Sequence, residues 1–256
     1  MRIACLFLLW VAVLTSSAIG ASPDSLSFPA ILEVMKRSVG YIEIDVVLKG
    51  TKTKITTACG SGFLIDSAGV FATCRHVVID NRSVEVTIPD SLRDSTETDT
   101  TRVVELSTDT SSITIHMTTI NQTFKAHVVA ERQDRDVALI QIDRSGKPLD
   151  TNLFVPDAGT TKDIVEGIEV ACTGHDLGQA SEFQDIVRKH LTTHKGIISC
   201  GKASGTLEAP FLDQFQLDVF INHGASGAPV YRTSDGVVLG MIQGNEARIV
   251  AGEKLN

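Results

Sequence analysis

Short runs of β-branched residues, separated by turn residues, constrain the fold of this chain most. Val, Ile and Thr dominate the runs, and Gly, Asp, Asn, Ser or Pro lies between them. One helical stretch, 30–37, precedes the first run, and no long amphipathic helix pattern follows. Strands at such short intervals are typical of an all-β barrel or sandwich. The predicted strands are 39–48, 83–88, 112–120, 124–130, 137–142, 168–173, 196–200, 215–221 and 236–243.

The N-terminus has the pattern of a cleaved secretory signal peptide covering residues 1–21. Arg2 is followed by an apolar run from Ile3 to Leu14 and then by small residues up to Ala21. This run is too short to span a bilayer comfortably, and no second apolar run follows it. We expect the mature chain, 22–256, to be secreted or periplasmic and to leave the membrane after cleavage. A buried or membrane-anchoring N-terminal helix is the alternative.

The charge pattern excludes one class of partner. The net charge is −8, and no dense Lys/Arg cluster is present, so we expect no nucleic-acid binding.

The segment Asp90–Ser112 is rich in Ser, Thr, Asp and Glu, which predicts a solvated surface loop. A lid over a cleft and a weak cation site are alternatives for this segment.

Four cysteines follow the signal peptide, an even number in a chain expected to be exported, so disulfides are predicted. Cys59 and Cys74 flank a predicted hairpin as diagonal cross-strand neighbours, and we expect them to pair. Cys172 and Cys200 are the second expected pair. None of them has C-x-x-C spacing, which argues against a structural zinc site.

Three local patterns carry residue types that can do chemistry. A hairpin beginning Gly60–Asp66 leads into a second strand that ends at His76. Asp136 lies directly before a strongly apolar strand, where a carboxylate is costly unless its charge is compensated. Ser226 has glycines close on both sides, which permit a tight turn that exposes its hydroxyl and nearby N–H groups. Taken singly, these are also the features of a surface histidine, a turn aspartate and a glycine-rich hairpin.

Together and in this order, the patterns resemble the trypsin-like serine proteases, most closely the HtrA (Deg) branch. The matching sequences are GSGFLID with HVV, DVALI, and INHGASGAP, within a similarity running from about Ala30 to Gly244. The resemblance implies one protease domain, 22–256, built from two six-stranded antiparallel β-barrels at about 38–146 and 160–251. As a departure from the family, we expect the domain to be short at its C-terminal end and to lack the PDZ domain of many bacterial relatives.

The resemblance further implies the roles of single residues in cutting polypeptide substrates. Ser226 would be the nucleophile, His76 the general base and then acid, and Asp136 the carboxylate that orients the imidazole. The N–H groups of Gly224 and Ser226 would form the oxyanion hole. Such chemistry needs no metal and no cofactor.

A pocket position of the family matches Ile221, with Phe220 beside it. Neither side chain can pair with a basic group, so we expect cleavage after small or medium apolar residues. The oligomeric state stays open.

Several positions depart from the family pattern. Ala225 stands where Asp or Asn is usual, which excludes activation through an ion pair with a newly cut N-terminus. Ala228 replaces a glycine and therefore requires a negative φ.

Two other interpretations compete with that of a serine protease. His190 and His194 have the spacing of a metalloprotease helix but lack its glutamate. A catalytically weak or inactive homologue acting as an extracellular binding module is the rival interpretation.

Overall fold

The computed structural model describes residues 27–87, 101–144, 152–175, 190–204, 211–219 and 221–244. The predicted signal peptide, residues 1–21, lies outside them. Within the described ranges, no helix is long and apolar enough to cross a membrane.

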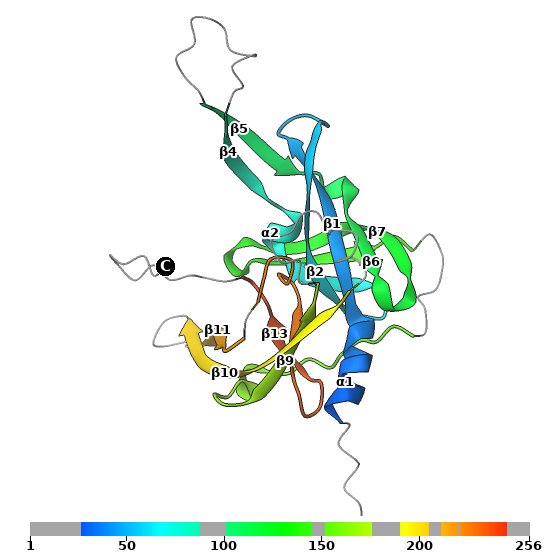
Figure 1. The fold of residues 1–256 in the computed structure, drawn as a ribbon, viewed down its shortest axis with the longest axis vertical. Coiled ribbons are helices and arrows are strands. Elements are labelled where there is room, and N and C mark those ends of the chain that lie inside the picture. Colours follow the sequence, from blue (N-terminus) through cyan, green and yellow to red (C-terminus); the bar gives the residue numbers. More distant parts are fainter. Residues whose placement is uncertain are drawn as a thin grey trace, which may run out of the picture.

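The first half of the chain forms a closed antiparallel barrel (Figure 1). In the larger sheet the strand order is β2-β3-β8-β7-β6-β1, and a further pairing of β2 with β1 closes the ring. A long β1–β2 hairpin makes this closure, with Val39 opposite Phe63 and Val47 opposite Lys54. The barrel strands are β1 Val39–Leu48, β2 Lys54–Asp66, β3 Val70–Cys74, β6 Thr114–Met117, β7 Gln122–Arg132 and β8 Val137–Ile142.

The second half forms a curled five-stranded sheet in the order β11-β10-β9-β12-β13. The mainly β architecture with two barrel-like halves agrees with the predicted double β-barrel, and this half has five strands among the described residues. Its strands are β9 Glu169–Gly174, β10 Thr192–Ser204, β11 Phe211–Leu217, β12 Pro229–Arg232 and β13 Val238–Met241. His194 lies on β10, so the helical spacing of His190 and His194 has no helix to act on.

Helix α1, Phe28–Met35, begins with Pro29 in its first turn, where the missing N–H costs nothing. Ile31 and Met35 are one turn apart and almost fully buried, each worth about 1.5–3 kcal/mol of burial. They pack against residues from both sheets, so the helix covers the junction of the two halves. The remaining short helices are η1 Lys36–Ser38, α2 Arg75–Val78, η3 Thr110–Ser112, η4 Thr118–Ile120, η5 Gln133–Arg135 and η6 Thr161–Asp163.

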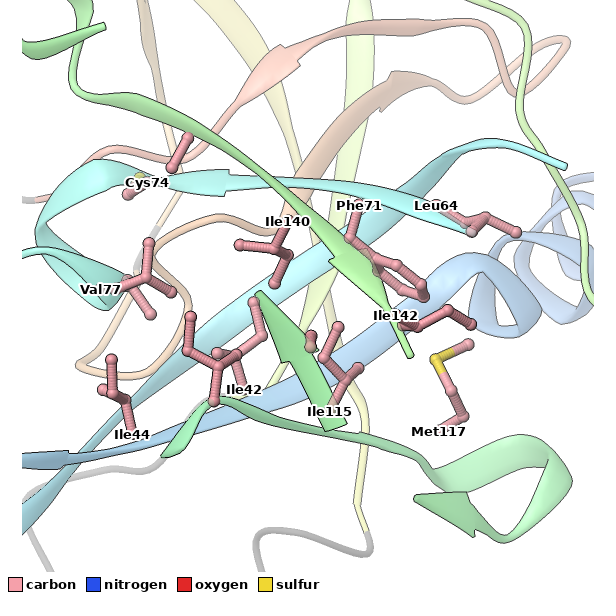
Figure 2. Packing of buried hydrophobic residues seen from close by; sticks show 14 residues of the cluster. Ile42, Ile44, Leu64, Phe71, Cys74, Val77, Ile115, Met117, Ile140 and Ile142 are labelled. Carbon is pink, nitrogen blue, oxygen red and sulfur yellow. The ribbon is translucent and has the colours of Figure 1, made fainter. Parts of the chain in front are cut away.

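The barrel interior is filled by apolar side chains from every barrel strand, with isoleucine the most frequent (Figure 2). Phe71, Ile140 and Ile115 are fully buried at its centre. Cys74 and Val77, the residues before and within α2, belong to the same cluster. The helix that carries His76 is therefore anchored in the barrel core.

The predicted surface loop Asp90–Ser112 is wrong in its second part. Strand β5, Thr101–Thr108, pairs with β4, Asn81–Thr87, and the two form a hairpin that projects from the barrel (Figure 1). At its base, β5 pairs with the last residues of β1. Val103 is 62% exposed, because both faces of the outer hairpin meet solvent. Exposure of both faces explains the polar composition of the hairpin. Residues 88–100 lie outside the described ranges.

Candidate active site

His76 and Asp136 are in direct contact. The imidazole Nδ1 lies 2.6 Å from Asp136 Oδ2, and the backbone N–H of His76 donates to Asp136 Oδ1 over 2.9 Å. A carboxylate only accepts hydrogen bonds, so Nδ1 carries a proton, and in the uncharged form of the ring Nε2 presents its lone pair. The second contact also satisfies an N–H in the first turn of α2, which has no partner within the helix. Asp136 thus fixes both the ring and the helix that holds it.

The backbone at Asp136 makes this contact possible. Asp136 follows η5 and adopts a left-handed conformation, φ 51° and ψ 42°, which aspartate tolerates better than most residues. Strand β8 then pairs with β3, with Val137 opposite Cys74. This register brings Asp136 beside the start of α2, where its carbonyl accepts the Arg75 N–H over 3.0 Å.

The Ser226 loop folds as the glycines predicted. Gly224 and Gly227 have φ of 95° and 90°, conformations that favour glycine. Ser226 between them is partly exposed, and its carbonyl accepts the Ser61 N–H over 2.8 Å. Among the described residues, the only non-glycine residues with positive φ are Asn121 and Asp136. Ala228 therefore meets its predicted condition.

Gly60 joins the serine loop to the histidine helix. A Cβ atom at this position would lie 2.6 Å from Val77 Cγ2 and 3.1 Å from the Ser226 carbonyl oxygen. Val77 follows His76 on α2, so the close approach of the serine loop and the histidine helix depends on a glycine here. The N–H groups of Gly224 and Ser226 donate to no protein acceptor within the described residues. Donors left unused in this way are what an oxyanion site requires.

Ser61 is a residue whose importance the sequence pattern did not reveal. It is fully buried, and its hydroxyl donates to the Gly224 carbonyl over 2.8 Å while accepting the His175 N–H over 2.9 Å. Thr73 donates to the Ser61 carbonyl over 2.7 Å. One first-barrel serine thus bonds the serine loop at two points, the carbonyls of Gly224 and Ser226. The GSG pattern marks its position but not these bonds.

We expect Gly227→Ala to unfold the serine loop. A Cβ at Gly227 would lie 1.9 Å from the Ser61 carbonyl oxygen and 2.6 Å from Thr73 Oγ1, both part of a buried network. Strain at positive φ adds about 1–3 kcal/mol, so we expect a total destabilisation of more than about 3 kcal/mol. Denaturant unfolding measures this loss.

Gly167→Ala is the matched control, because Gly167 has φ of 84° with nothing within 4 Å of the new Cβ. It carries the strain without the clash, and should cost about 1–2 kcal/mol. Equal losses in the two variants would contradict the argument from crowding.

The predicted disulfides are wrong. Cys59, Cys74 and Cys172 are all thiols, and Cys74 Sγ donates to the Ile242 carbonyl over 3.0 Å. Burial, and then the charge of Asp136, raises the pKa of the Cys74 thiol. These three thiols leave neither predicted pair formed.

Strand register gives the reason. Continuing the pairing of Phe63 with Ala72 places Ser61 opposite Cys74. Cys59 is then a diagonal neighbour, at about 7–8 Å between Cα atoms, beyond the usual disulfide range. In the second sheet, His194 lies opposite Cys172. Cys200 lies six residues farther along β10. At about 3.4 Å per residue, its distance from Cys172 also exceeds the disulfide range.

Cys74, His76 and Asp136 present possible metal-ligand atoms within 4.8 Å of one another. The 2.6 Å separation of His76 Nδ1 and Asp136 Oδ2 is that of a hydrogen bond. Two ligands at about 2.0–2.2 Å from a tetrahedral zinc ion lie farther apart than this. The geometry fits a proton between the two groups.

Of the predicted pocket residues, Ile221 is 9% exposed and packs beneath the serine loop with Ala225, Ala228 and Val230. Phe220 lies outside the described residues.

A closed barrel and a second curled sheet, with a contacting histidine and aspartate and a glycine-framed serine, define the class of protein. A family model, the trypsin-like peptidase domain, matches residues 60–241, and the chain belongs to this family.

Within the class, the chain is similar to HtrA proteases. It is 26% identical over 225 residues to Serine protease HTRA1 of Xenopus tropicalis, covering 87% of this chain and 38% of that protein. Serine protease HTRA1B of Danio rerio is 27% identical over 237 residues, covering 90% of this chain and 40% of its own length. Protease Do-like 1, chloroplastic, of Arabidopsis thaliana is 27% identical over 225 residues, with 85% and 41% covered. The chain thus spans about two fifths of the length of these relatives.

Proposed function

We propose that the chain is a serine endopeptidase that cleaves polypeptides through an acyl-enzyme, with Ser226, His76 and Asp136 as its triad. The observation that carries the proposal is the double hydrogen bond between Asp136 and His76. It fixes the tautomer and the direction of the imidazole, which is the task of the carboxylate in such a triad.

In the first step, Ser226 Oγ attacks the carbonyl carbon of the scissile peptide bond while His76 Nε2 takes its proton. The tetrahedral oxyanion accepts hydrogen bonds from the Gly224 and Ser226 N–H groups, which no protein acceptor occupies among the described residues. His76 then gives the proton to the leaving amine, and an acyl-enzyme remains. Water, activated by the same imidazole, hydrolyses the ester and restores Ser226.

The family membership supports this chemistry, since the Xenopus and Danio relatives above are named serine proteases. We further propose export of the mature chain, on the leader pattern of residues 1–21, so that its polypeptide substrates lie outside the cytoplasm.

A fluorophosphonate probe tests the function. We expect it to label wild-type protein on Ser226, because labelling requires an activated serine and a formed oxyanion site. Ser226→Ala should abolish labelling, and mass spectrometry of the modified peptide identifies the residue. Folded wild-type protein that neither reacts nor cleaves casein would instead favour the binding module.

We expect cleavage after small or medium apolar residues. Ile221 supports this expectation, because it is apolar and lies in the core beneath the serine loop. An apolar pocket wall disfavours Lys and Arg, because their charged groups would lose hydration on burial and would find no partner of opposite charge there. A peptide library profiled by mass spectrometry measures the preference, and strong selection for Arg or Lys would contradict it.

A further inference from the structure

The two residues after β13, Ile242 and Gln243, tie the first barrel to the serine loop. The buried Ile242 carbonyl accepts the Gly227 N–H over 2.8 Å and the Cys74 thiol over 3.0 Å. Gly227 follows Ser226, and Cys74 is the residue from which α2 begins. The Ile242 N–H in turn donates to the Ala228 carbonyl over 2.9 Å. The Ile242 carbonyl thus contacts both halves of the candidate site.

The Gln243 side chain reaches the other part of the site. Its Nε2 donates to the Arg135 carbonyl over 2.6 Å, between residues 108 positions apart in the sequence. That carbonyl belongs to the peptide bond that leads directly into Asp136. A part-buried amide from the second half of the chain therefore holds the peptide plane next to the carboxylate.

This peptide plane needs support. Asp136 has the left-handed conformation, which costs L-residues about 1–2 kcal/mol. The local bond that closes the turn, from the Asp136 N–H to the Gln133 carbonyl, is long at 3.3 Å. The Gln243 bond is the shorter of the two and acts on the same turn from outside. Rotation of this peptide would turn the carboxylate away from His76.

We propose that Gln243 is a positioning residue, which fixes the turn before Asp136 and so sets the carboxylate for its bond to His76. The inference deepens the proposed function and rests on it. Because Gln243 follows Ile242 directly, the serine loop and the carboxylate are set by one dipeptide. The alignment of the two halves of the site is then a property of the segment 242–243.

Gln243→Met tests the proposal, since methionine has similar length and no N–H donor. We expect kcat/KM to fall about 10–100-fold, mostly in kcat, as for a small misplacement of a catalytic group. The acid limb of the pH–rate profile should move to lower pH, because the imidazolium loses part of the carboxylate's stabilisation. The far-downfield proton resonance of His76 Nδ1–H should weaken or shift.

Gln141→Met is the matched control. Gln141 Nε2 donates to the Ala68 carbonyl over 2.8 Å, the same kind of bond to a first-barrel carbonyl but distant from His76. We expect it to leave kcat/KM, the acid limb and the resonance unchanged. Gln243→Glu keeps the size of the side chain and loses the donor, so kcat/KM and the Nδ1–H resonance should respond as in Gln243→Met, which guards against an effect of packing. Its acid limb is not compared, because the added negative charge acts on the imidazolium itself.

The outcomes separate the two proposals. A wild-type Nδ1–H resonance that changes in Gln243→Met but not in Gln141→Met supports positioning, even if the fluorophosphonate fails and the peptidase proposal falls. An active wild type whose acid limb and resonance are unaltered in Gln243→Met overturns the inference. A fall in kcat with lowered thermal stability and an unchanged acid limb also overturns it, because it would indicate a structural role.

Discussion

Ser226→Ala and His76→Ala should each reduce kcat by about 10⁶, and the double variant should lose no more than either. In the proposed triad the two side chains act as one proton-transfer unit, so removing one leaves the other without a function. The residual rate comes from substrate binding and the oxyanion donors. Stopped and continuous assays with a peptide substrate measure the three values.

His127→Ala is the control for this experiment. His127 Nδ1 lies 2.8 Å from Asp143 Oδ1, a histidine–aspartate pair of the same kind in the same barrel, both of whose side chains are about half exposed. We expect its loss to leave kcat unchanged. Additive losses for Ser226→Ala and His76→Ala would show that the two residues act separately, which contradicts a triad.

Asp136→Asn should lower kcat by about 10⁴ while leaving the fold intact. Asparagine tolerates the left-handed backbone, so the turn at φ 51° persists. Its amide, however, can donate to Nδ1, which would place the imidazole proton on Nε2 and leave the serine facing the wrong tautomer. The pH dependence of kcat and circular dichroism of the folded variant separate chemistry from stability.

Asp134→Asn is the matched control two positions earlier. Asp134 bonds Arg132 at the surface, and exposed pairs of this kind contribute at most about 1 kcal/mol. We expect it to retain wild-type activity. A comparable loss in both variants would assign the effect to general charge and not to the contact with His76.

The sequence predicted the barrel strands well where their pattern was strong. Val39–Leu48 and Val137–Ile142 were predicted with the bounds they have, because alternation and β-branching coincide there. Thr101–Thr108 was mistaken for loop, since a strand solvated on both faces carries no apolar alternation. Sequence patterns reveal a strand when one of its faces is buried, and the outer hairpin has little buried surface.

The residue types of the candidate site were predictable from the sequence, but the residues that hold them in place were not. The motifs indicated that His76 and Asp136 belong to one site, and the two side chains are bonded. Ser61 and Gln243 escaped notice because their bonds join residues more than a hundred positions apart. The cysteine pairs failed for a related reason, since spacing along the chain does not give strand register.

The β4–β5 hairpin is attached to the barrel at its base by Val46–Leu48 of β1. The ring of hydrogen bonds that closes the barrel does not pass through it, so its outer part can be shortened or exchanged without opening the ring. The base is different, because Thr108 Oγ1 donates to the Val78 carbonyl over 3.0 Å and accepts the Asp80 N–H over 3.1 Å. These bonds clamp the end of the helix that carries His76. A graft placed on the outer hairpin, beyond Leu106, should therefore leave the bonds that hold the His76 helix intact.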